Sequence, residues 1–332
     1  MIVTKRHKWI LLGFVVLFPL AGILHFMSGH LDLGSSDLWN ALFHFDPENT
    51  NQLIAREVRI PRMFTAIIAG AGLSVAGLLM QTLFNNPLAG PYVLGINSGA
   101  SLFVAFSIMT GIPFLSSDFG IITNALLGAL VFGLIISVFS EIVRSQISLL
   151  LIGIMLGSFT GAIVSLLEVS SDSSELKVFT IWSLGSLSRI QFEQIPLISS
   201  IFFAGILGSI LLIKPLNLLV LGQEQAKLLG LNYRRMRFFI IGVTAILTGI
   251  ITAYCGPIAF VGLAVPNLVR ILLKTQHHGL LIVSCAFIGG IFVLLCDALI
   301  QVMENSMLIP INVLTSLIGA PIVVLLILRK LR

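Results

Sequence analysis

The sequence predicts an all-helical protein that crosses a membrane about ten times. Three observations support this: an apolar composition, long apolar runs and an uneven distribution of charge. Of the 332 residues, 57% are hydrophobic and 10% are charged, and the mean hydropathy is +1.07. This leaves too little polar surface to coat a soluble globule of that length. Backbone polar groups inside a bilayer must be paired within the protein, so the apolar runs indicate helices.

The apolar runs divide the chain into ten expected spans, because about 20 apolar residues cross about 30 Å of hydrocarbon. The run from Phe238 to Leu273 is too long for one crossing, and Gly256-Pro257 breaks it into two tightly joined helices. The expected spans are 9–28, 62–84, 93–112, 118–140, 147–169, 194–213, 238–256, 258–273, 279–301 and 311–328. Together they form a single transmembrane domain, residues 1–332.

Basic residues concentrate on one side of the predicted membrane. With the N-terminus inside, the inside segments hold 14 of the 19 Lys and Arg residues, but only Glu141 and Glu224 of the 14 acidic residues. Cytoplasmic loops are enriched in Lys and Arg. We therefore expect both termini in the cytoplasm and an even number of spans. The basic residues left outside are Arg56, Arg59, Arg62, Lys177 and Arg189.

The chain lacks the patterns of an enzyme. No Gly-x-x-x-x-Gly-Lys-Ser/Thr phosphate loop occurs, so the chain does not hydrolyse ATP by itself. Cys255, Cys285 and Cys296 fall in or beside apolar runs without metal-ligand or disulfide spacing, and we interpret them as packing residues. We expect no catalytic residue, no cofactor, no metal and no nucleic-acid partner. Of the ionisable residues in the apolar runs, we assign Asp297 mainly to a structural hydrogen-bonded role and Glu168 to the water interface.

Two segments outside the expected spans have features of possible binding surfaces. Within 214–237, a helix of about seven residues is expected between Gly222 and Gly230, with Gly230 as its C-terminal cap. This helix could dock into another protein or lie on the lipid headgroups as a capped loop. On the opposite side, three arginines occur between Arg56 and Arg62. They could receive an acidic partner or anchor the helix end at the interface.

Five stretches of the sequence together identify a family. They are VRIPR at 58–62, GLLMQTLFNNPLAGPYVLGINSGAS at 77–101, LGQEQAKLLGLN at 221–232, GPIAFVGLAVPNLVR at 256–270 and IGAP at 318–321. In this order they resemble the FecCD family of ABC permeases, which import iron-siderophores, haem and vitamin B12. Long motifs in the right order are more specific than any single loop.

The resemblance implies a type II ABC importer permease fold with ten helices per subunit, in the bacterial inner membrane. It also implies a second permease copy, forming a homodimer or a paralogous heterodimer around a central pathway. Two cytoplasmic ABC ATPase subunits and an extracytoplasmic substrate-binding protein complete the assembly.

The resemblance also assigns roles to individual residues. Arg59 and Arg62 match the arginines that receive acidic residues of the binding protein. The segment that couples to the ATPase corresponds to Gly222, Gln223, Glu224, Ala226, Leu229 and Gly230. The cytoplasmic gate corresponds to Asn86, Pro87 and Leu88, with Gln146 and Ile147 as a second layer.

The sequence departs from the family pattern on the outer side. Gln301 stands where the vitamin B12 permease has a further docking arginine, and 308–312 reads LIPIN instead of Glu-Leu-Pro-x-Gly. The docking surface is therefore expected to be specialised, and the resemblance does not fix the substrate. Two rival functions remain: an ion-coupled secondary transporter with Asp297 in a proton relay, and a membrane scaffold that does not transport.

Overall fold

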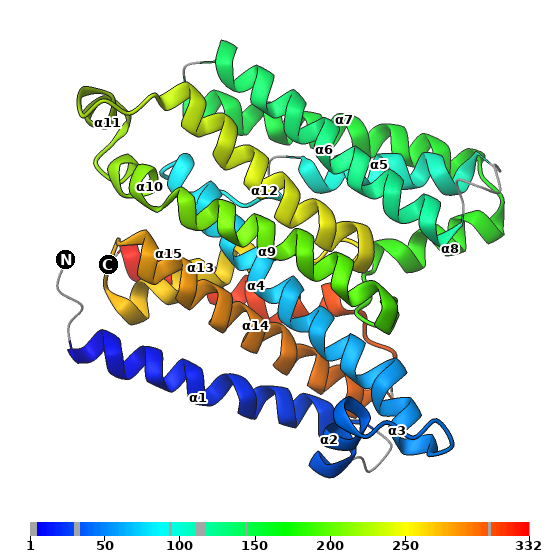
Figure 1. The fold of residues 1–332 in the computed structure, drawn as a ribbon. Helices are drawn as coiled ribbons and strands as arrows, with labels where there is room; N and C mark the ends of the chain where they lie inside the picture. Colours follow the sequence, from blue (N-terminus) through cyan, green and yellow to red (C-terminus); the bar gives the residue numbers. More distant parts are fainter. Residues whose placement is uncertain are drawn as a thin grey trace.

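The computed structural model describes residues 5–29, 34–92, 95–110, 117–143, 145–304 and 307–331, and these contain helices, turns and bends but no strand. Figure 1 shows the helices as a bundle with most axes running between the same two ends. The elements are α1 (Lys5–Met27), α2 (Ser35–Phe43), α3 (Thr50–Ile54), the π-helix η1 (Ala55–Arg59), α4 (Ile60–Leu83), α5 (Ile96–Met109), α6 (Asp118–Ile142), α7 (Gln146–Ser170), α8 (Ser173–Ser183), the 3₁₀-helix η2 (Phe192–Gln194), α9 (Ile195–Leu211), α10 (Ile213–Leu219), α11 (Gln223–Leu228), α12 (Tyr233–Cys255), α13 (Val261–Leu273), α14 (His278–Met303) and α15 (Ile311–Leu331).

Ten apolar helices occupy the ten ranges expected from the sequence. Within the described residues, seven stretches are long and apolar enough to span a membrane: α1, α3 to α4, α6, α7, η2 to α9, α12 and α14. The shorter apolar helices α5, α13 and α15 fill the remaining three ranges. The break between α12 and α13 is confirmed, because Gly256 ends α12 with a φ of 72° and α13 starts only at Val261.

Several short helices were not expected from the sequence. They are α2, α3, α8 and α10, all too short to produce an apolar run of spanning length. Local polar signals start three of them, and before α3 the side chain of Asn49 accepts the backbone N–H groups of Asn51 and Gln52. The backbone N–H of Gly34 donates to Asp37 Oδ2 at 2.8 Å before α2, and that of Asp172 donates to Glu175 Oε2 at 3.4 Å before α8. Such caps satisfy backbone donors at a helix start and need no long apolar face.

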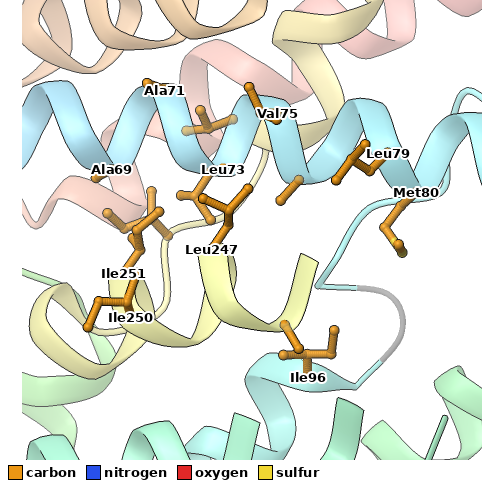
Figure 2. Close-up of a cluster of buried hydrophobic side chains, with 14 of the residues drawn as sticks. Ala69, Ala71, Leu73, Val75, Leu79, Met80, Ile96, Leu247, Ile250 and Ile251 are labelled. Carbon is orange, nitrogen blue, oxygen red and sulfur yellow. The ribbon is translucent and has the colours of Figure 1, made fainter. Parts of the chain in front are cut away.

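Helix α4 runs through the middle of the bundle, and nearly all of it from Thr65 to Leu83 is buried. It packs against α14, α12 and α13. Figure 2 shows apolar side chains of α4 facing Leu247, Ile250 and Ile251 of α12. At two places its backbone lies directly against that of α14 and α13, because a Cβ on Gly70 or Gly77 would overlap the carbonyl oxygen of Gly289 or Gly262. Close backbone approach of this kind requires residues without side chains.

The two ends of the bundle carry different elements. The start of α1, the end of α15 and the short helices α10 and α11 lie at one end, on the left of Figure 1, and α2, α3 and α8 lie at the other. We call these the α11 end and the α3 end. The start of α1 and the end of α15 lie at the same end of the bundle, as expected for a chain that crosses the membrane an even number of times.

The α4–α13 contact gives a test of the fold. Gly77→Ala should lower the stability of the protein by about 2 kcal/mol or more, because the added methyl group meets backbone that cannot move aside. Gly161→Ala on α7 is the matched control, since a Cβ there has no atom within 4 Å. Thermal unfolding in detergent measures both. Equal melting temperatures for the two variants would contradict the packing of α4.

Candidate functional site

Arg62 and Asp297 form a buried ion pair at the α3 end. Arg62 Nε donates to Asp297 Oδ2 at 2.7 Å, and Arg62 Nη2 donates to Asp297 Oδ1 at 3.0 Å. His25 Nε2 lies 2.7 Å from the same Oδ2. The Asp297 side chain is 2% exposed and the Arg62 side chain 12% exposed. A two-pronged arginine contact suits a carboxylate, so the hydrogen-bonded structural role expected for Asp297 agrees with its surroundings.

Arg59 joins the same cluster from the end of η1. Its Nη1 donates to the backbone oxygen of Ser28 and to Gln301 Oε1. Gln301 Nε2 in turn lies 3.1 Å from Asp297 Oδ2 and 3.0 Å from His25 Nε2. We call His25, Arg59, Arg62, Asp297 and Gln301 the α3-end cluster. Gln301, which the sequence marks as a lost docking position, serves here as a partner of Arg59.

The two predicted docking arginines therefore differ in their access to solvent. Arg59 is buried, and its Nη1 is hydrogen-bonded within the chain. Arg62, in contrast, lines a cavity of about 270 Å³ together with Asp297, Glu304 and the segments 184–188 and 308–311. Its Nη1 lies 3.8 Å from Glu304 Oε2, whose side chain is 44% exposed. A carboxylate entering the cavity could contact Arg62 in place of Glu304.

Arg56, the third arginine of this segment, has a different environment. Its guanidinium lies 4.2 Å from the ring centre of Phe45 and 4.9 Å from that of Phe192. Contacts of this kind attach a cation to aromatic faces. Arg56 therefore ties η1 to the loop after α2 and to η2, which fits the anchoring role that the sequence left open.

At the α11 end, the expected short helix is present between its two glycines. Gly222 precedes α11 with a φ of 99°, and Gly230 follows it with a φ of 85°. The N–H of Leu231 donates to Ala226 O at 3.0 Å, and that of Gly230 donates to Lys227 O at 2.9 Å. This pair of bonds is the Schellman cap, which needs a left-handed residue where Gly230 stands. The predicted cap is thus confirmed.

One side of α11 is anchored and the other is free. Ala226 is fully buried, whereas Leu228 is 88% and Leu229 60% exposed. Glu224 and Lys227 face water and pair with each other at 2.9 Å. Two exposed leucines on a rigid, capped turn form an apolar tip, which is typical of a surface that binds another protein. Leu229 was expected in this segment from the sequence, whereas Leu228 was not.

The predicted gate residues lie in the turn after α4. Asn85 takes a left-handed φ of 45° and ends the helix, and the N–H of Asn86 donates to Gln81 O at 3.1 Å. Asn86 Oδ1 then accepts the N–H of Leu88 at 2.9 Å. Asn267 of α13 holds the turn, since its Nδ2 donates to Pro87 O at 2.9 Å. We call residues 85–88 the gate turn.

A cavity of about 720 Å³ opens beside the gate turn. It is lined by residues of α4, α13, α15 and the loops between them: Gln81, Thr82, Asn85, Asn86, Pro87, Leu88, Val220, Asn267, Arg270, Ile271, Lys274, Gln276 and Val323. Of the second predicted gate layer, Ile147 is not among these lining residues and is 74% exposed. Gln146 starts α7, and its side chain lies outside the described part.

Sequence reasoning missed three polar residues that hold these ends. His25 was overlooked although it is an ionisable residue in an apolar run, which is the signal that identified Asp297. In the sequence, Arg270 counts only as one of the basic residues of the inside segments, and His278 is assigned no role. In the structure, Arg270 Nη1 donates to Gln81 Oε1 at 2.7 Å, and His278 is fully buried. Their partners lie on other helices, so spacing along one run could not reveal them.

Comparison with known proteins covers nearly the whole chain. Residues 16–329 match the FecCD transport family. The hemin transport system permease protein of Yersinia pestis is 34% identical over 97% of this chain and 96% of its own length. The vitamin B12 import system permease protein of Vibrio cholerae is 32% identical over 98% and 95%, and the molybdate import system permease protein of Haemophilus influenzae is 32% identical over 94% and 93%.

A solved structure shares the fold at full length. It is described as a metal-chelate type ABC transporter in an inward-facing conformation, and the two chains are 30% identical with a TM-score of 0.85. The match covers 97% of this chain and 99% of the other. The matched relatives are transport permeases, and the chain belongs to the FecCD transport family.

Proposed function

We propose that this chain is the membrane subunit of a binding-protein-dependent ABC importer, which moves a metal chelate inward across the bacterial inner membrane. The observation that carries the proposal is α11. A six-residue helix, fixed between two left-handed glycines and ending in two exposed leucines, is suited to insert into a partner. With α11 in the cytoplasm, the start of α1 and the end of α15 are cytoplasmic too, in agreement with the distribution of Lys and Arg.

The substrate class follows from relatives, and they limit it only broadly. The similar permeases are named for hemin, vitamin B12 and molybdate, and the similar structure for a metal chelate. Three of these four are metal complexes of organic ligands. We therefore favour an organic metal chelate, such as an iron-siderophore, haem or vitamin B12, over an inorganic anion.

The partners follow from the two ends of the bundle. A substrate-binding protein docks at the α3 end and reaches Arg62 through the cavity beside Glu304. Two ATPase subunits bind at the α11 end, one to each of two permease copies, and their binding of ATP shifts the permease between outward-open and inward-open states. Such a shift requires that the ATPase binds one state more tightly than the other. The gate turn, with Gln146 and Ile147, closes the inner end.

An ion-coupled carrier fits the structure less well. Its proton relay would need Asp297 to exchange protons along the pathway. Asp297 is instead 2% exposed and is held by Arg62, His25 and Gln301. A carboxylate in a two-pronged contact with arginine keeps its negative charge. Family membership points the same way.

The role of α11 can be tested by charge at its tip. The double variant Leu228→Asp, Leu229→Asp should lose the ATPase subunit during purification, with binding weakened about 100-fold, because two buried interface leucines would become charged. Leu308→Asp is the matched control, since Leu308 is 82% exposed at the other end of the bundle. Co-purification and ATP hydrolysis by the complex are the readouts. Full retention of the ATPase by the double variant would reject the coupling role.

Docking at Arg62 can be tested in two ways: by removing the carboxylate of Glu304 that pairs with Arg62, or by removing the charge of Arg62 itself. Glu304→Gln should strengthen binding of the substrate-binding protein about two- to fivefold, because an exposed carboxylate no longer competes for Arg62. Arg62→Gln combined with Asp297→Asn should weaken it about tenfold or more, without leaving a buried charge unpaired.

The control for docking is Arg56→Gln, which removes an arginine of the same segment that aromatic rings hold away from the cavity. The affinity of the Arg56→Gln permease for the substrate-binding protein should stay within about twofold of that of the parent permease. Calorimetric titration of the binding protein against the permease in nanodiscs measures all variants. Docking through Arg62 would be refuted if Glu304→Gln and the double variant both bound with the parent affinity.

A further inference from the structure

The α11 end contains a buried polar cluster that the proposed gate and coupling segments both contact. It consists of Gln81 and Thr82 of α4, Asn217 of α10, Arg270 of α13 and His278 of α14, and we call it the Thr82 cluster. Gln81 is 2% and Thr82 8% exposed, and His278 is fully buried. Four helices thus place polar groups together in an apolar setting, where unpaired groups are costly.

The hydrogen bonds of the cluster run in one direction. Asn217 Oδ1 accepts the backbone N–H of His278 at 2.8 Å, which identifies this atom as the amide oxygen. His278 Nδ1 lies 3.0 Å from the same oxygen and must therefore carry a proton. In the neutral ring, Nε2 is then an acceptor at 2.8 Å from Thr82 Oγ1, which also lies 2.9 Å from Leu78 O. Because Nε2 has no other donor among the described residues, the single hydroxyl proton of Thr82 goes to it. Arg270 Nη2 approaches Thr82 Oγ1 at 3.4 Å.

Each end of this chain of hydrogen bonds reaches a moving part of the proposed cycle. Asn217 belongs to α10, which leads within a few residues to Gly222 and α11. At the other end, Arg270 holds Gln81 Oε1 at 2.7 Å, one turn before the gate turn begins. Asn267, one turn before Arg270 on α13, holds the gate turn itself through Pro87 O. The coupling segment and the gate turn are therefore fastened to the same side chains.

The surroundings leave room for these parts to move. A second cavity, of about 200 Å³, separates the end of α4 from the coupling segment and is lined by Thr82, Leu83, Asn85, Leu219, Gly222 and Gln223. The cavity of about 720 Å³ also borders the gate turn, at Asn85 to Leu88. These spaces interrupt direct packing between α11 and the gate turn, so a displacement of α11 reaches the gate turn through α10, which packs on α4 and contributes Asn217 to the Thr82 cluster.

We propose that the Thr82 cluster is the link that transmits movement of the coupling segment to the gate turn. Thr82 and His278 act as positioning residues, because they connect α10 to the end of α4 and belong neither to the gate turn nor to the apolar tip of α11. The inference rests on the proposed function, since it assumes that α11 receives the ATPase.

The experiment uses the gate turn as its own reporter. Cys255, Cys285 and Cys296 are at most 2% exposed, so Leu88→Cys supplies a single accessible thiol. The full complex of permease and ATPase is purified, and the rate of labelling by a maleimide probe is measured in the nucleotide-free state and after trapping with ATP and vanadate. In the Leu88→Cys parent, the two rates should differ about fivefold or more, the usual range for coupled sites.

Thr82→Val is the test variant, because it removes the hydroxyl and keeps the shape. Its ratio of labelling rates should fall to within about twofold of one, while ATP hydrolysis and co-purification stay as in the parent. Thr65→Val is the matched control on the same helix. Thr65 is 3% exposed, and its hydroxyl donates only to the preceding turn, at Pro61 O. It should keep the parent ratio.

His278→Asn is a second test variant. If Thr82→Val reduces stability or loses the ATPase, the result for His278→Asn decides whether the proposed link holds. Asparagine retains a donor near the position of Nδ1 and lacks Nε2, so it breaks the contact with Thr82 alone. His278→Gln, which places a polar atom near Nε2, should recover part of the response. If the parent responds and both test variants respond as Thr65→Val does, the inference is wrong and the proposed function stands. If the parent itself shows equal rates in the two states, both are wrong.

Discussion

The burial of α4 is the constraint on which the rest of the molecule depends. A helix enclosed by α12, α13 and α14 can be approached closely only where it has no side chain in the way. Gly70 and Gly77 supply two such places, seven residues apart and so on nearly the same face, against Gly289 and Gly262. These backbone contacts fix the position of α4 along its neighbours, and hence the position of the polar groups at both of its ends.

The charged groups at those ends are satisfied between helices rather than within one. Arg62 of α4 finds Asp297 of α14, and Arg270 of α13 finds Gln81 of α4. Removing one partner of a buried pair leaves a charge without compensation, at a cost of about 3–5 kcal/mol. Each cluster therefore specifies which helix ends meet, although its net contribution to stability is small, because burying a charge costs about as much as its pairing returns.

The sequence predicted the fold further than it predicted the sites. Apolar runs are a property of single segments, so all ten helices were found and even the Gly256-Pro257 break was placed correctly. The cap at Gly230 is likewise local. The surroundings of Arg59 were not predictable, because its burial depends on Ser28 and Gln301, which lie 31 and 242 residues away. Short amphipathic helices such as α2 and α8 were missed because they produce no apolar run.

A rigid α4 offers a physical route between the two faces of the protein. Arg62 and Thr82 are 20 residues apart on one unbroken helix, which is about 30 Å at 1.5 Å per residue. In its middle, the backbone of α4 packs directly against that of its neighbours at Gly70 and Gly77. Such close packing leaves little room for α4 to bend or to slide alone, so we expect it to move as a rigid helix together with its neighbours. A carboxylate that drew Arg62 away from Asp297 would release α4 from α14 at the α3 end. The Thr82 cluster would then be displaced together with α4 at the α11 end, because Thr82 and Gln81 are residues of that helix. Coupling between two binding sites is reciprocal in free energy. If binding of the ATPase at the α11 end changes the affinity for the substrate-binding protein through α4, binding of that protein at the α3 end must change the affinity for the ATPase by the same factor.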